Sequence, residues 1–187
     1  MGRWEPDARQ RLEQAALELF AEQGFAATTV PEITARAGLT TRTFFRHFAD
    51  KREVLFAEDQ AAEAAERLLT TAPPDAAPLT LILDGLRAVA TERFEPKREH
   101  LRALRAIIRT DDGLRERELH KHAALREAVR TGLLARGLPS TTAALLAEIC
   151  TTLLFVSVDE WLDRDDDRPL ADIIGDTLTA LRAVLKI

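Results

Sequence analysis

Apolar residues recur along almost the whole chain with the spacing of amphipathic helices. Between Leu12 and Phe20 they fall at positions i, i+3, i+4, i+7 and i+8, which places them on one face of a helix. Alternation of apolar and polar residues between turn signals, which marks β-strands, is absent from the sequence. The pattern therefore predicts an all-α fold of about nine helices, separated by glycine and proline signals.

A short segment near the N-terminus has the N-cap and turn residues of a helix-turn-helix motif. Thr29 is the expected N-cap of a short helix, and Gly38 can adopt the left-handed turn that follows it. Thr40 is the next expected N-cap, and Phe44 and Phe48 lie four residues apart on one helical stripe. We expect this phenylalanine pair to face the core, so that the remaining side chains of the second helix point outward.

The charge of the chain is concentrated at the same place. The net charge of -5 argues weakly against a nucleic-acid-binding protein, yet five basic residues oppose one acid, Asp50, between Arg36 and Arg52. The DNA major groove admits one α-helix and offers acceptors that arginine can meet with two hydrogen bonds. The predicted DNA contacts, which include phosphate anchors at the helix ends, are Thr29, Arg36, Thr40, Thr41, Arg42, Thr43, Phe45, Arg46, His47 and Lys51.

Three short motifs in this region, Thr-Val-x-x-Ile, Ala-Gly-Leu-Thr and Phe-Arg-His-Phe-x-x-Lys, resemble the N-terminal domain of TetR-type regulators. The resemblance covers roughly the first third of the chain and implies that the second helix of the motif reads the major groove. It also implies that Phe45 lies against the DNA backbone, that His47 touches a phosphate or a base edge, and that Lys51 binds phosphate. The sequence departs from the common pattern in having Arg42 instead of Gly and Phe45 instead of Tyr. The operator sequence therefore cannot be inferred from the resemblance.

We predict two domains: residues 1–55, with the motif at about 29–48, and a helical effector-binding and dimerisation domain at residues 56–187. A long helix from about Lys51 to Thr70 should join them and act as a lever. Further helices are expected at about 79–94, 96–109, 113–135, 140–163 and 169–186.

The helix at 140–163 is apolar on more than one face, which a single core cannot cover. With the helix at 169–186 it should form the interface of a homodimer, and two reading heads would then require a palindromic operator. A central helix in a monomer is the alternative interpretation.

Single side chains on the body helices are candidates for an effector site. His122 shares a helical stripe with Leu125 and Val129. Histidine and apolar residues at helical spacing are also typical of a plain core, so both interpretations remain open. The candidate ligand contacts are Phe94, Leu104, Ile108, His122 and Phe155.

Cysteine content and the N-terminus indicate the compartment. Cys150 is the only cysteine, so no intramolecular disulfide can form, and a reducing compartment such as the cytoplasm is expected. The first ten residues lack the basic start and apolar stretch of an export signal. Residues 141–158 carry one charge but several threonines and no basic flank, which is typical of a buried helix and not of a membrane span.

Metal and enzyme motifs are incomplete. The acidic run from Asp163 to Asp167 resembles the start of a calcium loop, but Arg168 and Ile174 occupy the positions that require glycine and glutamate. The motifs of zinc hydrolases, serine hydrolases and phosphate-binding loops are also missing. We therefore expect no metal, no cofactor and no enzymatic activity.

Together the patterns predict a DNA-binding transcriptional regulator. The resemblance implies a repressor that a small-molecule effector releases from its operator. The alternative is a helical oligomeric ligand-binding or scaffolding protein that does not bind DNA.

Overall fold

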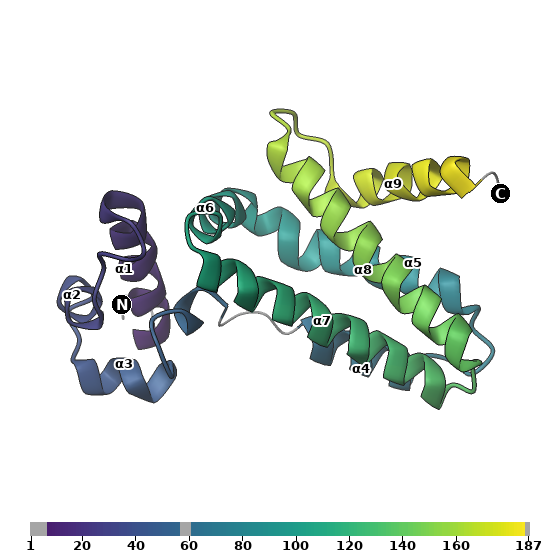
Figure 1. The fold of residues 1–187 in the computed structure, drawn as a ribbon, viewed down its shortest axis with the longest axis horizontal. Coiled ribbons are helices and arrows are strands. Elements are labelled where there is room, and N and C mark those ends of the chain that lie inside the picture. Colours follow the sequence, from purple (N-terminus) through teal and green to yellow (C-terminus); the bar gives the residue numbers. More distant parts are fainter. Residues whose placement is uncertain (1–6, 57–60, 186–187) are drawn as a thin grey trace, which may run out of the picture. The chain divides into compact units, whose positions relative to one another are not determined.

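The computed structural model describes residues 7–56 and 61–185, and every regular element in these two ranges is helical, which confirms the expected all-α class (Figure 1). The α-helices are α1 (Ala8–Gln23), α2 (Val30–Arg36), α3 (Thr41–His47), α4 (Ala61–Thr71), α5 (Pro78–Val89), α6 (Arg98–Ile108), α7 (Asp112–Ala135), α8 (Ser140–Asp163) and α9 (Leu170–Leu185). Shorter helical turns lie at Glu53–Leu55, Ala90–Phe94 and Glu95–Lys97. The last of these contains a proline, which cannot donate the hydrogen bond that an α-helix needs.

Tertiary contacts divide the chain into two compact units. The head unit combines residues 1–59 with residues 102–118, and the body unit combines residues 60–101 with residues 119–187. Helices α6 and α7 therefore each contribute to both units.

The core of the head unit forms where α1, α2 and α3 meet. Leu12, Ile33 and Phe44 are completely buried, and the predicted pair Phe44 and Phe48 pack with their ring centroids 5.3 Å apart. Burying each of these large side chains contributes roughly 1.5–3 kcal/mol to folding. The three short elements are thus held by one shared core.

Residues that the sequence assigned to the body complete this core. Ile107 and Ile108 at the end of α6, and Leu114 at the start of α7, belong to the same buried cluster as the motif residues. Helical periodicity shows that these side chains have an apolar face but cannot show which core that face covers.

The expected continuous helix from Lys51 to Thr70 is wrong. Asp50 accepts a hydrogen bond from the backbone of Glu53 at 2.8 Å, as a helix cap would, but only a single 3-10 turn follows. Val54, Leu55 and Phe56 are all buried in the head core. Three consecutive buried residues cannot lie on one stripe of a surface helix, because successive residues point in different directions. Helix α4 begins at Ala61, and residues 57–60 lie outside the described part.

The body unit is built around α8, which packs against α5 and α9. One face of α8 is buried in the body core, where Ala143, Ala147 and Trp161 lie, while Leu145 and Val156 on other faces are exposed. Within the described ranges, α8 alone is long and apolar enough to cross a membrane by length and composition. A core helix of a soluble protein meets the same criterion, and the burial of one face of α8 fits that explanation.

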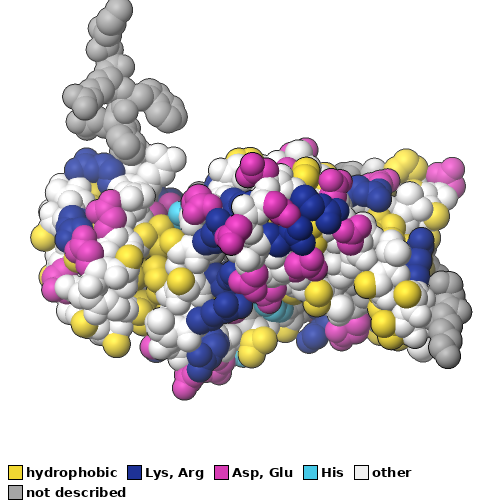
Figure 2. Space-filling view, turned by 90° about the horizontal axis from the view of Figure 1, so that it is seen from above, with side chains coloured by type: hydrophobic (Ala, Val, Ile, Leu, Met, Phe, Trp, Pro, Cys, Tyr) yellow, Lys and Arg dark blue, Asp and Glu magenta, His cyan; other side chains and the backbone are white. Residues whose placement is uncertain are grey.

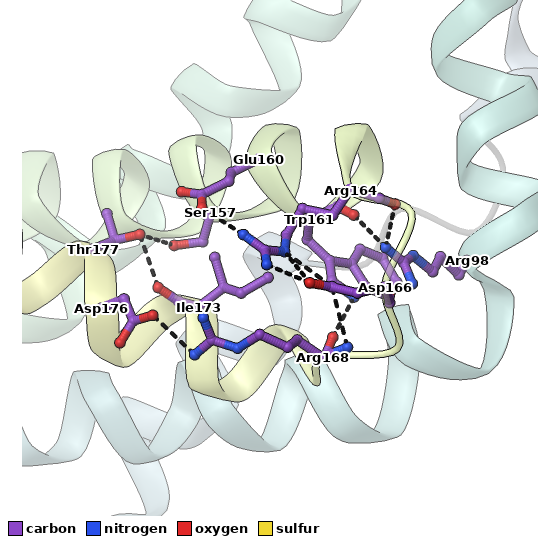
Figure 3. A network of polar contacts seen from close by, with 10 residues as sticks. All are labelled: Arg98, Ser157, Glu160, Trp161, Arg164, Asp166, Arg168, Ile173, Asp176 and Thr177. Atoms are coloured by element: carbon purple, nitrogen blue, oxygen red, sulfur yellow. Dashed lines mark hydrogen bonds and ion pairs between the residues drawn. The ribbon is translucent and has the colours of Figure 1, made fainter.

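An arginine at the start of α6 closes the C-terminal end of α8 (Figure 3). Arg98 donates hydrogen bonds to the carbonyl oxygens of Trp161, Arg164 and Asp166 at 2.7, 2.8 and 2.5 Å. Its guanidinium lies 4.9 Å from the centre of the Trp161 ring, whose Nε1 donates to the carbonyl of Arg168. The last carbonyls of a helix lack partners within the helix, so a cation here stabilises its end.

The acidic run lies in this connection between α8 and α9. The carboxylate of Asp166 pairs with Arg164, which lowers the pKa of Asp166 to about 2. Asp165, Asp166 and Asp167 are exposed, and no cluster of three potential metal-binding side chains occurs in the described part of the chain. The run therefore has the character of a solvated loop.

Candidate nucleic-acid interface and body cavity

Helix α3 presents one buried and one exposed face. Its N-cap is Thr40, whose hydroxyl accepts a hydrogen bond from the backbone of Thr43 at 3.2 Å. With Phe44 directed into the core, the side chains of Thr41, Arg42, Phe45 and Arg46 are exposed and those of Thr43 and His47 are half-buried. The exposed fraction of Phe45 is 56%, which is high for an aromatic side chain. The outward face expected from the sequence is present, and its contact with DNA stays a prediction.

Side chains on this face differ in how freely they can move. Arg46 Nη2 lies 3.3 Å from His47 Nε2, so these two residues hold each other at the end of the helix. Among the residues that the structure describes, none forms a hydrogen bond or ion pair with the side chain of Arg42. Arg42 can therefore extend toward a base edge without first breaking an internal contact.

The angle between α2 and α3 is fixed by a tight turn. Gly38 has a φ of 64°, in the left-handed region that glycine adopts without strain. Arg11 of α1 donates to the carbonyl oxygen of Ala37 at 2.5 Å and so satisfies the end of α2. Leu39 packs against the head core at the corner. Arg11 could not be identified as a turn-supporting residue from the sequence, where its only signal is its place beside Leu12 at the edge of the apolar stripe.

The start of α2 is a complete capping box. The Thr29 hydroxyl accepts from the Glu32 backbone at 3.4 Å, and the Thr29 backbone donates to the Glu32 carboxylate at 2.7 Å. The same carboxylate accepts from the Thr29 hydroxyl, which is the main cause of the lowered pKa of Glu32. Thr29 is thus engaged in the head itself, and its contact with DNA remains a prediction.

Arg36 forms ion pairs with α1. It binds Glu22 through two hydrogen bonds of 2.9 and 2.8 Å and approaches Glu18 at 3.4 Å. These contacts raise the pKa of Arg36. The acids come from residues outside the window in which the sequence showed a local excess of positive charge, so Arg36 contributes less free charge than the sequence indicated.

Lys51 supports the loop between α1 and α2. Its ammonium donates to the carbonyl oxygens of Phe25 and Thr28 at 2.6 and 2.7 Å and lies 4.2 Å from the centre of the Phe25 ring. Burial lowers the pKa of Lys51. A lysine ammonium has three N–H groups, so one remains for a phosphate.

Charges of both signs are mixed over the rest of the surface. Figure 2 shows Lys and Arg side chains interspersed with Asp and Glu across the face that it presents. With a net charge of -5, the chain has no overall attraction for phosphate. Any affinity for DNA must therefore come from the local arrangement around α3.

The body unit contains an apolar cavity of about 60 Å³ that is partly open to solvent. It is lined by residues of α4, α5, α7 and α8, namely Ala61, Ala64, Ala65, Leu68, Leu69, Ile82, Gly85, Leu86, Val89, Leu125, Val129, Cys150 and Leu154. Gly85 permits a close approach, because a Cβ atom there would lie 2.3 Å from Leu68 Cδ2.

The five candidate ligand residues lie outside the lining of this cavity. His122 and Phe155 come together with ring centroids 3.3 Å apart, and Phe94 packs against the body core. Ile108 is buried in the head core and Leu104 packs against it. The sequence allowed two interpretations of Leu104 and Ile108, a ligand contact or a plain core position. Their environment in the structure is that of core residues.

Comparisons with known proteins agree with the geometry. Residues 13–57 match the family described as bacterial regulatory proteins, tetR family. The HTH-type transcriptional regulator TcmR of Streptomyces glaucescens is 36% identical over 115 residues, which cover 58% of this chain and 51% of TcmR. In that alignment the chain spans about half the length of its relative. The regulator MftR of Mycobacterium tuberculosis, named for mycofactocin biosynthesis, is 26% identical over 94% of this chain and 89% of its own length.

Solved structures show the same fold over almost the whole chain. The transcriptional regulator FadR from Bacillus subtilis, solved in complex with stearoyl-CoA, has a TM-score of 0.58 and 18% identity, covering 92% of this chain and 96% of FadR. The family match covers the helix-turn-helix, and the structural match extends through the body. The resemblance seen in the sequence is confirmed, and the alternative of a scaffolding protein is not favoured. The chain is therefore similar to transcriptional regulators of the TetR family, and its residues 13–57 match the model of that family.

Proposed function

We propose that this chain is a homodimeric transcriptional repressor that binds a palindromic operator through α3 and releases it when a small molecule binds the body unit. The observation that carries the proposal is the outward face of α3, where the Arg42 side chain makes no hydrogen bond or ion pair with any residue that the structure describes, beside an exposed Phe45. A side chain of this kind on a capped helix suits the major groove. DNA as the target and a single cysteine, Cys150, support a cytoplasmic location.

The chemistry of this face assigns roles to individual side chains. The Arg42 guanidinium can donate two hydrogen bonds to O6 and N7 of a guanine, an interaction that discriminates by roughly 1–3 kcal/mol. Phe45 lacks the hydroxyl of a tyrosine and offers an apolar surface to a sugar or a thymine methyl group. Lys51 can add a phosphate contact through its remaining N–H, so specificity would come mainly from Arg42.

Exposed apolar residues on the last two helices support a homodimer. Leu145 and Val156 of α8 are 60% and 50% exposed, and Val184 and Leu185 of α9 are 78% and 54% exposed. A second copy that packs its own α8 and α9 against these faces would bury them in a four-helix bundle. Two heads related by a two-fold axis would meet half-sites separated by about one helical turn of DNA (on the order of 34 Å) or a multiple of it.

The body cavity is the proposed effector site. FadR from Bacillus subtilis, which shares this fold, was solved in complex with stearoyl-CoA, and this supports ligand binding by a protein of this architecture. Five of the residues that line the cavity come from α4. A ligand that binds the two states of the dimer with different affinity would shift the spacing of the heads through this helix, and a coupling of roughly 1–3 kcal/mol is typical.

A mobility shift with the DNA that flanks the gene tests the proposal. We expect a sequence-specific complex that Arg42→Ala weakens by at least about tenfold, because the bidentate base contact is lost. Arg67→Ala is the matched control, since Arg67 is an exposed arginine of α4 in the body unit. Equal affinity of the wild type and Arg42→Ala for the specific site would contradict the assignment, and sedimentation of a monomer only would contradict the dimer.

A further inference from the structure

The junction between α5 and α6 departs from α-helical geometry. A π-helical turn at Ala90–Phe94 is followed by the 3-10 turn at Glu95–Lys97. Side chains three positions apart lie on the same side of a 3-10 turn, whose period is three residues. Glu95 and Arg98 are accordingly both half-buried, while the two residues between them are exposed. The junction therefore presents one acidic and one basic side chain on the same side of the chain.

Both side chains bind the connection between α8 and α9. Arg98 donates to three carbonyl oxygens at and beyond the C-terminal end of α8, and its guanidinium lies over the ring of Trp161 (Figure 3). Glu95 accepts a hydrogen bond of 3.3 Å from the backbone of Ala171, at the start of α9. The first amides of a helix carry partial positive charge and its last carbonyls partial negative charge. The acid thus lies at the positive end of α9 and the base at the negative end of α8, so both contacts are attractive.

Helix α6 links this junction to the head core. Its first turn belongs to the body unit, where Leu101 packs against the body core, and Ile107 and Ile108 at its end are buried in the head core. At a rise of about 1.5 Å per residue its 11 residues span about 16 Å, so a tilt of about 10° at the start moves the far end by about 3 Å. Neighbouring base pairs of DNA are about 3.4 Å apart along the axis. A small change in the direction of α6 is therefore comparable with one step along an operator.

We propose that Glu95 and Arg98 are positioning residues for operator binding. By binding the connection between the two helices of the proposed homodimer interface, they fix the direction in which α6 leaves the body unit. They thereby set the separation of the two reading heads and the half-site spacing that the dimer accepts. The inference rests on the proposed function, because it requires a homodimer with two heads. Neither residue is among the predicted DNA contacts, so their effect is on geometry and not on the affinity of a single head.

The separation of the heads is measured first without DNA. A spin label at Gln14→Cys, an exposed position of α1, in a Cys150→Ala background reports the distance between the two heads by pulsed electron paramagnetic resonance. We expect a narrow distance distribution when the junction is intact. Arg98→Met and Glu95→Met should each broaden it by about 3 Å or more, because the direction of α6 becomes variable. Glu95→Gln keeps an oxygen that accepts from the amide of Ala171 and should restore the narrow distribution.

Half-site spacing is measured next with the unlabelled protein. Operators whose half-sites are moved by one base pair should bind the wild type at least about tenfold more weakly than the natural spacing, because the contacts of one head are misplaced. In Arg98→Met this ratio should fall below about threefold. A ratio of two affinities cancels any inactive fraction, so a loss of stability alone leaves it unchanged. Arg168→Met is the matched control, since it removes a side chain of the same connection that pairs with Asp176 of α9, and it should keep the ratio.

The outcomes separate this inference from the proposed function. Broadening in both junction variants that is reversed in Glu95→Gln and absent from Arg168→Met supports the inference. An unchanged distance distribution and spacing ratio in Arg98→Met, or equal changes in Arg168→Met, would overturn it, and a change in Arg98→Met alone would overturn the role of Glu95. A dimer that binds no operator contradicts the proposed function alone, because the label distances still decide whether the junction sets the separation of the heads. A monomer contradicts both.

Discussion

Replacing Lys51 by methionine separates a structural role for this residue from a purely DNA-binding one. The change keeps most of the apolar stem but removes the ammonium that bonds to the carbonyl oxygens of Phe25 and Thr28. Hydrogen bonds to charged groups contribute about 1.5–3 kcal/mol each, and a cation over an aromatic ring adds about 0.5–1 kcal/mol at exposed sites. Lys51 is half exposed, so water replaces much of these interactions in the variant, and the loss is smaller than the sum of the lower values. We expect Lys51→Met to lower the free energy of unfolding by about 2 kcal/mol.

Urea unfolding at fixed protein concentration measures this change, and the salt dependence of operator binding is measured on the same samples. Arg42→Met is the matched control, because the Arg42 side chain makes no hydrogen bond or ion pair among the described residues. It should weaken DNA binding and change the unfolding free energy by less than about 0.5 kcal/mol. If Lys51→Met left stability unchanged within that margin while reducing the salt dependence, Lys51 would be only a phosphate contact and the reasoning from its carbonyl partners would be refuted.

Three further changes test the fold around the site. Arg98→Met should lower the free energy of unfolding by about 3 kcal/mol and the Tm by roughly 6–12 °C, because three carbonyl oxygens lose their hydrogen-bond donor. Arg87→Met is the control at an exposed ion pair and should lower the Tm by less than about 2 °C. Thr40→Ala should cost about 1 kcal/mol in urea unfolding through loss of the N-cap of α3, and an unchanged value would show that the cap is dispensable. The lowered pKa of Asp166 means that its pairing stabilises the folded state above its ordinary value near 3.8 and is lost as the pH falls toward about 2. Asp166→Asn should therefore remove part of the pH dependence of unfolding between pH 4 and pH 2, and identical profiles would exclude this contribution.

Local chemistry explains why the helix-turn-helix could be read from the sequence. The caps of α2 and α3, the turn at Gly38 and the pair Phe44 and Phe48 each depend on residues within four positions of one another. Such interactions can be recognised in the amino-acid sequence because the interacting residues are close together in the chain. The predicted orientation of α3 follows from them.

Interactions between distant residues could not be read in the same way. Arg36 finds its carboxylates on α1, and the sequence contains no signal that links residue 36 to Glu18 and Glu22. Lys51 binds backbone carbonyls, which every residue possesses and no sequence pattern marks. The cavity depends on four helices whose apolar faces look like ordinary core, so its position required their packing.

Part of the head core is supplied by residues 102–118, which lie far from the N-terminal segment in the sequence. This limits where the protein can be truncated or joined to another one. A fragment ending at the predicted boundary after residue 55 would lack Ile107, Ile108 and Leu114 and would leave the surfaces they cover exposed to water. A chimera that exchanges reading heads between regulators of this family should therefore carry residues 102–118 together with the N-terminal segment. Residues 102–118 also belong to helices that contribute to both units. A substitution there that is compatible with the body of one regulator can therefore destabilise the head of another.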